Sequence, residues 1–357
     1  MQLLLMNNKI LTIEGITYSP KELFEISRKM ILDSTQPQWK RDIFDFILDW
    51  MDDNDYVEVN TSGSTGNPKT IQLLKKDMIA SAHLTGEYFN LIPGNRILLA
   101  LPAQYIAGKM MIVRAIALGL DLYFTSPASD FWEEIDSNFD FVAVVPLQMK
   151  TLLKHPAKAN YFKTILIGGA TLDLSLEDRL QQLSTAIFHS YGMTETITHV
   201  AIKTINGENR STYYRALTGI SFSVNSNNCL KIHASHLNKD FFTNDIVELH
   251  DSRHFKWLGR ADNVINSGGI KISPEVIEEK ISNLIRERFF ITALPDNTLG
   301  QKLVLVIEGV PFDQQNIKTL KNNIFTLVKK YENPKEIIFI EKFTETSTGK
   351  IVRKNSI

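Results

Sequence analysis

Short apolar runs bounded by turn residues recur through the first two thirds of the chain, and each run predicts a buried β-strand. These runs cover residues 96–102, 120–125, 141–146, 164–169 and 186–192. Between them, residues 106–118 and 174–183 have the apolar spacing of helices. Buried strands that alternate with helices predict a mainly parallel α/β sheet with helices packed against it.

Two of the predicted strands lead directly into glycine-containing turns. The turns are residues 168–170 and residues 191–193. Ligands of parallel α/β sheets bind at the carboxyl ends of the strands. We therefore expect both turns to lie on one rim of the sheet and to face the same ligand.

A loop rich in hydroxyls and glycines lies between two short strand patterns, 55–60 and 70–74. It contains Thr61, Ser62, Gly63, Ser64, Thr65, Gly66, Asn67, Pro68 and Lys69. Accessible backbone amides, hydroxyl donors and a lysine suit a polyphosphate, although an ordinary surface loop has the same inventory. The glycine spacing differs from that of a P-loop, and strands flank the loop on both sides, which predicts the tip of a hairpin.

The pattern changes near residue 259, after which a shorter unit begins. It predicts a helix with Ser273 as N-cap and Pro274 as its first residue. Strands at 289–294, 302–308 and 336–340 and a helix at 313–331 complete a small α+β unit. We predict a large domain over residues 1–259 and a small domain over residues 260–357.

The composition is that of an ordinary globular protein, with 357 residues and a net charge of −1. This balance argues against nonspecific nucleic-acid binding as the main activity, without excluding a local basic pocket. Cys229 is the only cysteine, so no intramolecular disulfide can form, and a cytoplasmic location is expected. The apolar segment 110–124 contains two charged residues and is not expected to span a membrane.

Six motifs occur in the order that is typical of one enzyme superfamily. They read NTSGSTGNPKT at 60–70, IGGA at 167–170, YGMTET at 191–196, FFTNDIVEL at 241–249, GRADNVINSGGIKISPEVIE at 259–278 and STGKIVRK at 347–354. On these motifs the chain resembles the adenylate-forming superfamily of acyl- and aryl-CoA ligases, luciferases and peptide-synthetase adenylation domains. The resemblance implies a shortened adenylate-forming fold. It also implies a reaction in which a carboxylate attacks the α-phosphorus of ATP and a thiol then displaces AMP.

The resemblance implies roles for these motifs toward ATP, Mg²⁺ and coenzyme A. It gives catalytic roles to Lys350, Thr65, Lys69 and Glu195, with Glu195 also as the magnesium ligand. The ATP-binding residues that it implies are Thr61, Ser62, Gly63, Ser64, Thr65, Gly66, Lys69, Gly168, Gly169, Ala170, Ser190, Tyr191, Gly192, Met193, Thr194, Asp245, Arg260 and Lys350. Asp262 would be the hinge between the domains, and Gly268 and Gly269 would line the coenzyme A channel.

Residues 101–115 resemble the acid-binding segment of o-succinylbenzoate–CoA ligases of menaquinone synthesis. The acid-binding residues that this implies are Tyr105, Gly108, Lys109 and Arg114, although Tyr105 and Ala107 replace a histidine and a serine of that pattern. An arginine in an apolar helix is costly unless it is paired, and a second carboxylate on the substrate would pair it. The alternative is that Arg114 pairs with an acid of the protein or reaches water.

Two departures from the superfamily leave other functions open. Asn244 replaces the glycine of the T-G-D ribose motif, and the short segment before residue 60 predicts a trimmed large domain. Three alternatives therefore stand beside an o-succinylbenzoate–CoA ligase: another aryl- or acyl-CoA ligase, a module that loads a carrier protein, and an inactive nucleotide-binding protein. A trimmed domain could expose apolar surface, so a homodimer is also open.

Overall fold

The computed structural model describes residues 10–60, 70–172, 174–344 and 351–353. The chain divides into two compact units. The first contains the described residues up to 172 together with 179–221 and 233–241, and the second contains 174–178, 222–232 and the described residues from 242 onward. The predicted domain boundary after residue 259 falls within the second unit, and a hinge at Asp262 stays a prediction.

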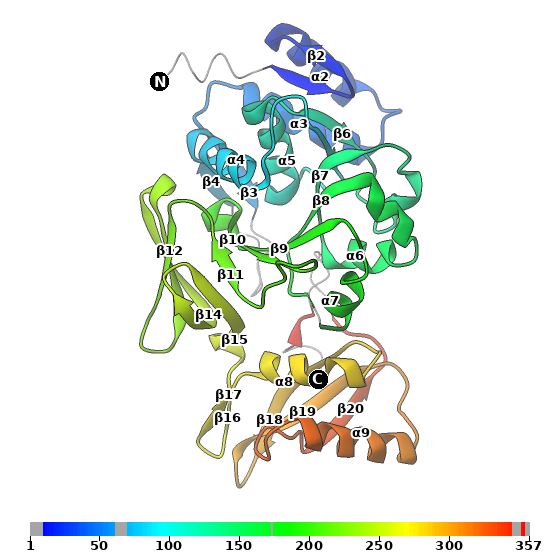
Figure 1. Ribbon diagram of the computed structural model, residues 1–357, viewed down its shortest axis with the longest axis vertical. Helices are drawn as coiled ribbons and strands as arrows, with labels where there is room; N and C mark the ends of the chain where they lie inside the picture. The colour runs from blue at the N-terminus through cyan, green and yellow to red at the C-terminus, as the bar shows by residue number, and fades with distance from the viewer. Residues whose placement is uncertain (1–9, 61–69, 173, 345–350, 354–357) are drawn as a thin grey trace. The chain divides into compact units, whose positions relative to one another are not determined.

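A mixed β-sheet organises the first unit (Figure 1). Its strands are β1 (Leu11–Ile13), β2 (Ile16–Tyr18), β5 (Arg96–Leu99), β6 (Asp121–Phe124), β7 (Phe139–Val144), β8 (Phe162–Ile167), β9 (Ala186–Gly192), β10 (His199–Thr204) and β11 (Tyr214–Ala216). They lie in the order β11-β10-β9-β8-β7-β5-β6-β1-β2. Strands β1 and β5 to β9 run parallel, whereas β2, β10 and β11 are antiparallel to their inner neighbours. The predicted α/β class is confirmed.

Helices connect these strands. They are α2 (Pro20–Leu32), α3 (Gln38–Met51), α4 (Lys75–Phe89), α5 (Ile106–Leu118), α6 (Pro146–Leu152) and α7 (Leu174–Leu180). Short 3₁₀ helices are η1 (Phe131–Glu134), η2 (Pro156–Tyr161), η3 (Thr194–Thr196), η4 (Ser235–Leu237), η5 (Ala261–Asn263) and η6 (Ser282–Leu284). None of the described helices combines the length and the apolarity that crossing a bilayer requires.

Local sequence explains where the best-defined helices begin and end. At the start of α2, Ser19 and Glu22 form a capping box, in which each side chain accepts a hydrogen bond from the other residue's backbone N–H. Helix α5 has the predicted bounds and ends at Gly119, which takes a left-handed conformation with φ of 66°. Lys109 and Arg114 are the only charged residues of α5, and its residues 108–116 are all buried.

Strands β3 (Tyr56–Asn60) and β4 (Thr70–Leu74) pair antiparallel, with Asn60 opposite Thr70. The Thr70 hydroxyl donates a hydrogen bond to Asn60 Oδ1 at 2.8 Å and closes the last rung of the ladder. The predicted hairpin is therefore confirmed. Residues 61–69, which join its two strands, lie outside the described residues.

Four further strands neighbour one another in chain order. They are β12 (Ile220–Val224), β13 (Cys229–Ala234), β14 (Lys239–Asp251) and β15 (His254–Arg260). Strands β14 and β15 are antiparallel, and Asp245 lies opposite Arg260. Buried positions alternate with more exposed ones in these strands, so continuous apolar runs do not mark them.

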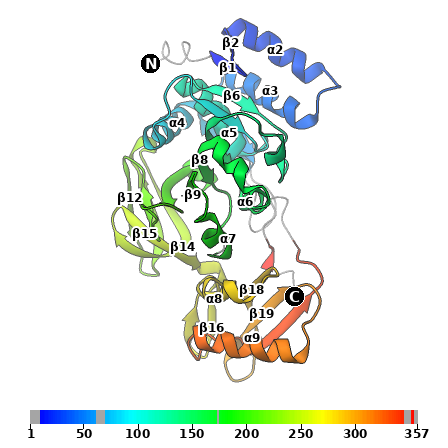
Figure 2. The same cartoon turned by 45° about the vertical axis from the view of Figure 1, so that its right-hand side comes forward.

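The second unit contains a small sheet with two helices on one face (Figure 2). Its elements are the hairpin β16 (Ile265–Ser267) and β17 (Ile270–Ile272), the sheet strands β18 (Phe289–Asp296), β19 (Gly300–Glu308) and β20 (Glu336–Ile340), and the helices α8 (Pro274–Ile281) and α9 (Gln314–Leu327). Ile277 of α8 and Ile324 of α9 join one core with Leu305 of β19. Phe290 and Val306 pack in a separate cluster with Phe343, because neighbouring strand residues point to opposite faces. The predicted α+β unit is confirmed.

Candidate active site

The two glycine-containing turns lie on the same rim of the first unit's sheet. Strands β8 and β9 are parallel neighbours, and Ile167 pairs with His189 where β8 ends. The Ser190 hydroxyl donates to the carbonyl of Ile167 at 2.9 Å. A Cβ on Gly168 would lie 2.7 Å from that hydroxyl, so a larger residue there would have to displace the Ser190 side chain. The expectation that turns 168–170 and 191–193 share a rim is confirmed.

His189 connects this rim to a more distant strand, and nothing in the motifs pointed to it. Its Nε2 lies 3.0 Å from the carbonyl oxygen of Ala170, and its Nδ1 lies 2.7 Å from the hydroxyl of Tyr214. Only 4% of His189 is exposed. Burial, assisted by the charge of Lys203, lowers the pKa of His189 to about 4. The imidazole is therefore neutral at physiological pH.

Tyr191 lies beside Tyr214 at the end of β9. The centres of the two rings are 5.8 Å apart, and their planes are inclined at 59°. Tyr191 is partly exposed, whereas Tyr214 is buried. The structure thus provides an aromatic surface supported from behind, as stacking on a nucleotide base requires. The adenine-binding role of Tyr191 stays a prediction.

The turn that follows β9 contains a backbone conformation unusual for its residue type. Ile197 has φ of 69° and ψ of −60°, and the N–H of Thr198 bonds to the carbonyl of Thr196 at 2.8 Å. These values define a strained γ-turn with a β-branched residue at its centre. Such strain costs about 1–3 kcal/mol and persists only where the surroundings impose it. The turn presents Thr194 and Glu195 from a fixed backbone.

Gly192 allows the strained turn to fold back against β9. A Cβ on Gly192 would lie 2.2 Å from the carbonyl oxygen of Thr198 and 2.6 Å from Cα of His199. Gly192 faces His199 in the ladder between β9 and β10. No side chain fits this gap, because both neighbours are backbone.

Glu195 is exposed at this turn, and its chemistry fits the predicted magnesium role. Mg²⁺ prefers oxygen ligands, and nucleotide sites hold it with one or two carboxylates while phosphates and water supply the rest. Within the described ranges, no group of three or more His, Cys, Asp or Glu residues could form a metal cage. A single carboxylate is therefore compatible with Mg²⁺ that arrives with a nucleotide.

Arg114 is a buried cation without a protein counter-charge among the residues that the structure describes. Only 2% of it is exposed, its Nη1 approaches the weak acceptor Met111 Sδ at 3.6 Å, and its Nε has no hydrogen-bond partner. Burial lowers the pKa of the guanidinium to about 10, with no carboxylate opposing this effect. Arg114 thus stays charged at neutral pH, with no carboxylate of the described residues to compensate it.

His199 and Thr85 accompany Arg114 inside the first unit. The Thr85 hydroxyl donates to the carbonyl of Ser81 at 3.1 Å, which leaves its oxygen to accept from His199 Nε2 at 3.2 Å. His199 is 7% exposed. Burial, and then the charge of Arg114, hold the pKa of His199 well below its ordinary value. The imidazole is neutral, so the guanidinium supplies the positive charge of this group.

Lys109, the other candidate cation of α5, has a different environment. Its ammonium lies 4.4 Å from the ring centre of Phe46. Burial lowers its pKa, while Asp49, Asp45 and Asp42 oppose the shift through their negative charges. Lys109 is therefore compensated by helix α3, whereas Arg114 is not.

The first turn of α5 is held tightly against the segment before it. Tyr105 is the N-cap residue and is half-buried. A Cβ on Gly108 would lie 2.2 Å from the carbonyl oxygen of Pro102, so only glycine fits at this position. The predicted acid-binding residues Tyr105, Gly108 and Arg114 are thus presented by one rigid helix.

Within the second unit, the predicted ribose and hinge residues come together. Arg260 lies 3.6 Å from Oδ1 of Asp245 and 3.1 Å from Oδ2 of Asp262. Trp257 donates its indole N–H to Asp245 at 3.2 Å, which orients the carboxylate. Asn244, which replaces the motif glycine, points its amide toward Asp262 at 3.3 Å. The departure at residue 244 is thus compatible with an ordered Asp245.

Gly268 and Gly269 form the tip of the hairpin between β16 and β17. Their φ angles are 59° and 82°, which are the left-handed values that a two-residue hairpin turn requires. The turn explains both glycines structurally. A role in a coenzyme A channel stays a prediction.

The phosphate-loop residues Thr61, Ser62, Gly63, Ser64, Thr65, Gly66 and Lys69, together with Lys350, lie outside the described residues. Their predicted roles therefore rest on the sequence. The described residues Ser190, Met193 and Thr194 lie in or beside the rim turn at the end of β9.

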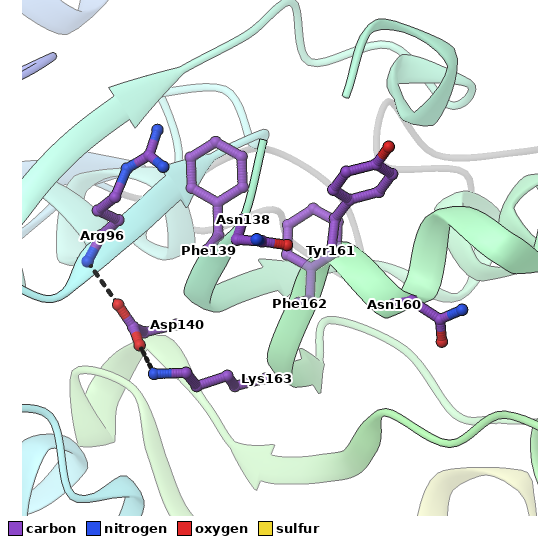
Figure 3. Close-up of a pocket in the computed structure, with 8 residues that line it drawn as sticks. All are labelled: Arg96, Asn138, Phe139, Asp140, Asn160, Tyr161, Phe162 and Lys163. Carbon is purple, nitrogen blue, oxygen red and sulfur yellow. Dashed lines mark hydrogen bonds and ion pairs between the residues drawn. The ribbon is translucent and has the colours of Figure 1, made fainter. Parts of the chain in front are cut away.

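A hollow of about 360 Å³ lies at the opposite edge of the sheet (Figure 3). It is lined by the first residues of β5, β7 and β8, including Arg96, Asp140 and Lys163. Asp140 accepts a hydrogen bond from the backbone N–H of Arg96 at 2.8 Å and forms an ion pair with Lys163. Asp140 and Lys163 are thus paired within the protein, and the Arg96 guanidinium lies over the rings of Tyr123 and Phe139. Ligands of parallel sheets bind at the other edge.

The sequence matches a known family. Residues 33–227, more than half of the chain, match the family model described as AMP-binding enzyme. The 2-succinylbenzoate–CoA ligase of Lactococcus lactis is 26% identical over 332 residues, which cover 86% of this chain and 71% of that protein. The probable 2-succinylbenzoate–CoA ligase of Mycobacterium tuberculosis is 24% identical over 328 residues, which cover 85% and 84% of the two chains.

Two solved structures share the fold. An acyl-CoA synthetase (AMP-forming)/AMP-acid ligase II-like protein from Dyadobacter fermentans is 38% identical, with a TM-score of 0.60, and the match covers 92% of this chain and 97% of that one. The o-succinylbenzoate CoA synthetase of Bacillus subtilis, in complex with its acyl-adenylate intermediate, superposes with a TM-score of 0.78. This match covers 98% and 97% of the chains at 16% identity, so it shows the fold alone.

Proposed function

Because the chain belongs to the AMP-binding enzyme family, we propose that it is an ATP-dependent acid–CoA ligase that acts through an acyl-adenylate. The acid attacks the α-phosphorus of ATP, which forms the acyl-adenylate and releases pyrophosphate. The thiol of coenzyme A then attacks the acyl carbon and displaces AMP. Catalysis of this kind depends on holding two anions together and on stabilising charge on the phosphoryl oxygens.

The rim of β8 and β9 is our proposed nucleotide site. Tyr191 stacks on adenine, Thr194 bonds to the α-phosphate, and Glu195 holds Mg²⁺, which would neutralise charge on the phosphates when bound. Asp245 accepts the ribose hydroxyls, and Arg260 assists it. The strained γ-turn supports this proposal, since backbone strain is concentrated at functional sites.

We further propose o-succinylbenzoate as the acid, in a step that would serve menaquinone biosynthesis. The observation that carries this proposal is the buried, uncompensated guanidinium of Arg114. A substrate with a second carboxylate would bring the counter-charge, whereas a long-chain fatty acid would leave the cation unpaired. The names of the Lactococcus and Mycobacterium relatives agree with this choice.

The decisive experiment measures pyrophosphate release with a panel of acids, with and without coenzyme A, and identifies thioesters by mass spectrometry. We expect release with o-succinylbenzoate and a thioester when coenzyme A is present. A thioester formed from a monocarboxylic acid in preference to o-succinylbenzoate would overturn the substrate. Release without any thioester would favour a carrier-loading module, and no release with any acid would favour an inactive nucleotide-binding protein.

Lys350 provides a separate test of the two-step mechanism. We propose that its ammonium stabilises the transition state of adenylation. Lys350→Ala should then slow adenylate formation by several orders of magnitude while largely sparing thioester formation from supplied acyl-adenylate. An equal loss of both half-reactions would contradict this role.

We place the reaction in the cytoplasm, where ATP and coenzyme A are both available. A homodimer stays a prediction, and sedimentation velocity on the purified chain would test it.

A further inference from the structure

We infer that His189 is a positioning residue of the nucleotide site, which ties the 168–170 turn to Tyr214 and thereby fixes the aromatic surface of Tyr191. The inference rests on the proposed function, because it takes this rim to be where the nucleotide base binds. His189 does not touch the base in this account. It acts through the two parts of the site that it connects, the 168–170 turn and Tyr214, which we call the two walls.

The chemistry of its partners fixes the tautomer of His189. The carbonyl of Ala170 can only accept a hydrogen bond, so Nε2 of the imidazole carries the proton. In a neutral imidazole, Nδ1 is then an acceptor, and the Tyr214 hydroxyl donates to it. Each ring nitrogen has one partner, and each partner belongs to a different wall. A single neutral side chain therefore sets the distance between the walls.

The connection joins a glycine-containing turn to a short strand. The 168–170 turn contains two glycines, Gly169 has φ of 83°, and Ala170 is exposed. Glycine lowers the barrier to other backbone conformations, so the hydrogen bond to Ala170 restrains a turn that would otherwise vary. Tyr214 is the first residue of β11, a strand of only three residues.

The connection runs in register across three strands. His189 of β9 lies opposite Lys203 of β10, and the Lys203 ammonium lies 5.7 Å from the ring centre of Tyr214 of β11. His189 and Tyr191 are two residues apart on β9 and therefore point to the same face of the sheet. Tyr214 thus meets both side chains, one through its hydroxyl and the other through its ring.

Substitutions can separate the hydrogen bonds from the bulk of the side chain. Glutamine in His189→Gln offers an amide NH₂ as donor and a carbonyl oxygen as acceptor, so it can replace both bonds. Leucine in His189→Leu fills similar space and makes neither bond. Tyr214→Phe keeps the ring beside Tyr191 and removes only the hydroxyl. His233→Gln is the matched control, because His233 is an exposed histidine on β13 that pairs with Asp240 away from the rim turns.

The experiment compares AMP, which carries the base, with inorganic tripolyphosphate, which does not. Calorimetric titrations of each probe into the full chain and its variants give the ratio of the two affinities. His189→Leu should weaken AMP binding about tenfold, the size expected for loss of one to two buried hydrogen bonds, and leave tripolyphosphate binding within about twofold. Tyr214→Phe should weaken AMP binding severalfold. His189→Gln and His233→Gln should match the parent.

Four outcomes decide between these roles. If AMP and tripolyphosphate weaken equally in step with a lower melting temperature, His189 is only structural and the inference is wrong. If His189→Leu does not fold, Tyr214→Phe with parental AMP binding would overturn the inference by itself. If the parent binds tripolyphosphate but not AMP, the proposed nucleotide function fails. If the parent binds AMP and the variants bind it equally well, only the inference about His189 fails.

Discussion

Two buried histidines of the first unit have opposite environments. His189 on β9 uses both ring nitrogens on partners that the chain supplies. His199 on β10 is also neutral, but it lies in the field of Arg114, whose Nε has no partner. The hydrogen bonds of His189 at the proposed nucleotide site are therefore complete without a ligand. The proposed acid pocket has no counter-charge for Arg114 among the described residues, and we expect a ligand to supply it.

This difference shows how one unit can hold a rigid wall and an unsatisfied pocket together. A satisfied polar network stabilises the fold, whereas an unpaired buried charge destabilises it. Natural proteins keep such destabilising groups where binding requires them. Substitutions at the two places should therefore change stability in opposite directions.

The largest effect is expected at Arg114. Arg114→Met should raise the KM for o-succinylbenzoate at least ~100-fold, because loss of one partner of a buried ion pair costs about 3–5 kcal/mol. The same variant should raise the free energy of unfolding of the ligand-free protein by about 1–3 kcal/mol, since an unpaired buried charge is removed. Steady-state kinetics and urea denaturation measure the two quantities.

Lys109→Met is the control for this prediction, because Lys109 lies on the same helix but is compensated by α3. Its KM for the acid should change much less than that of Arg114→Met. A destabilised Arg114→Met protein with an unchanged acid KM would show that Arg114 serves the fold and not the substrate.

Gly192→Ala should damage both regions at once. Its Cβ would clash with backbone atoms of Thr198 and His199, which follow the rim turn, and the buried His199 lies in the field of Arg114. Overpacking against backbone should lower the free energy of unfolding by about 3 kcal/mol or more. A crystal structure and denaturation curves of the variant would measure the shift, and a stability equal to that of the parent would contradict the close approach.

The stability of the protein should depend on pH through His189, the histidine whose two ring nitrogens both have partners. His189 has a pKa of about 4 in the folded chain, below its ordinary value of 6.5. Between these two values His189 binds a proton in the unfolded chain but not in the folded chain. Its contribution to the free energy of unfolding is therefore fully present above pH 6.5 and is lost as the pH falls toward 4. Lowering the pH from about 7 to about 5 should therefore reduce the free energy of unfolding by about 2 kcal/mol.

His189→Gln removes that titration while keeping both hydrogen bonds. Urea denaturation at the two pH values should show a smaller loss of stability for the variant than for the parent. Identical losses would mean that other groups account for the acid sensitivity. His199 contributes with the same sign and is present in both proteins.

The smallest effect should appear in the titration of His199 when the acid binds. A substrate carboxylate beside Arg114 would offset the field that helps to depress the pKa of His199, so this pKa should rise. The pKa of His189 should stay unchanged, because its partners belong to the chain. Histidine NMR titrations with and without o-succinylbenzoate would detect the shift, and equal movement at both histidines would remove the distinction.

The sequence predicts the rim turns well and the contacts of His189 and Tyr214 poorly. Strand β8 and helix α5 are marked by mainly apolar sequences, because most of their positions are buried. The bond between His189 and Tyr214 depends on the register of three strands, which no local pattern specifies. The same holds for the γ-turn at Ile197, since an isoleucine with positive φ contradicts its own preference.

Arg114 shows what a motif can and cannot provide. The resemblance identified it as a candidate, and its burial and lack of a carboxylate partner among the described residues became known only from the fold. For Lys109 on the same helix, no local pattern indicated the compensating aspartates of α3. Long-range charge compensation needs three-dimensional proximity, which apolar periodicity does not encode.

The contact between Gly108 and Pro102 limits how the range of acids can be re-engineered. Helix α5 cannot be displaced toward that carbonyl or carry any side chain at residue 108. Laboratory evolution toward bulkier or shorter acids must therefore proceed by exchanging side chains around a stationary backbone, with Tyr105 and Met111 as the natural positions to randomise.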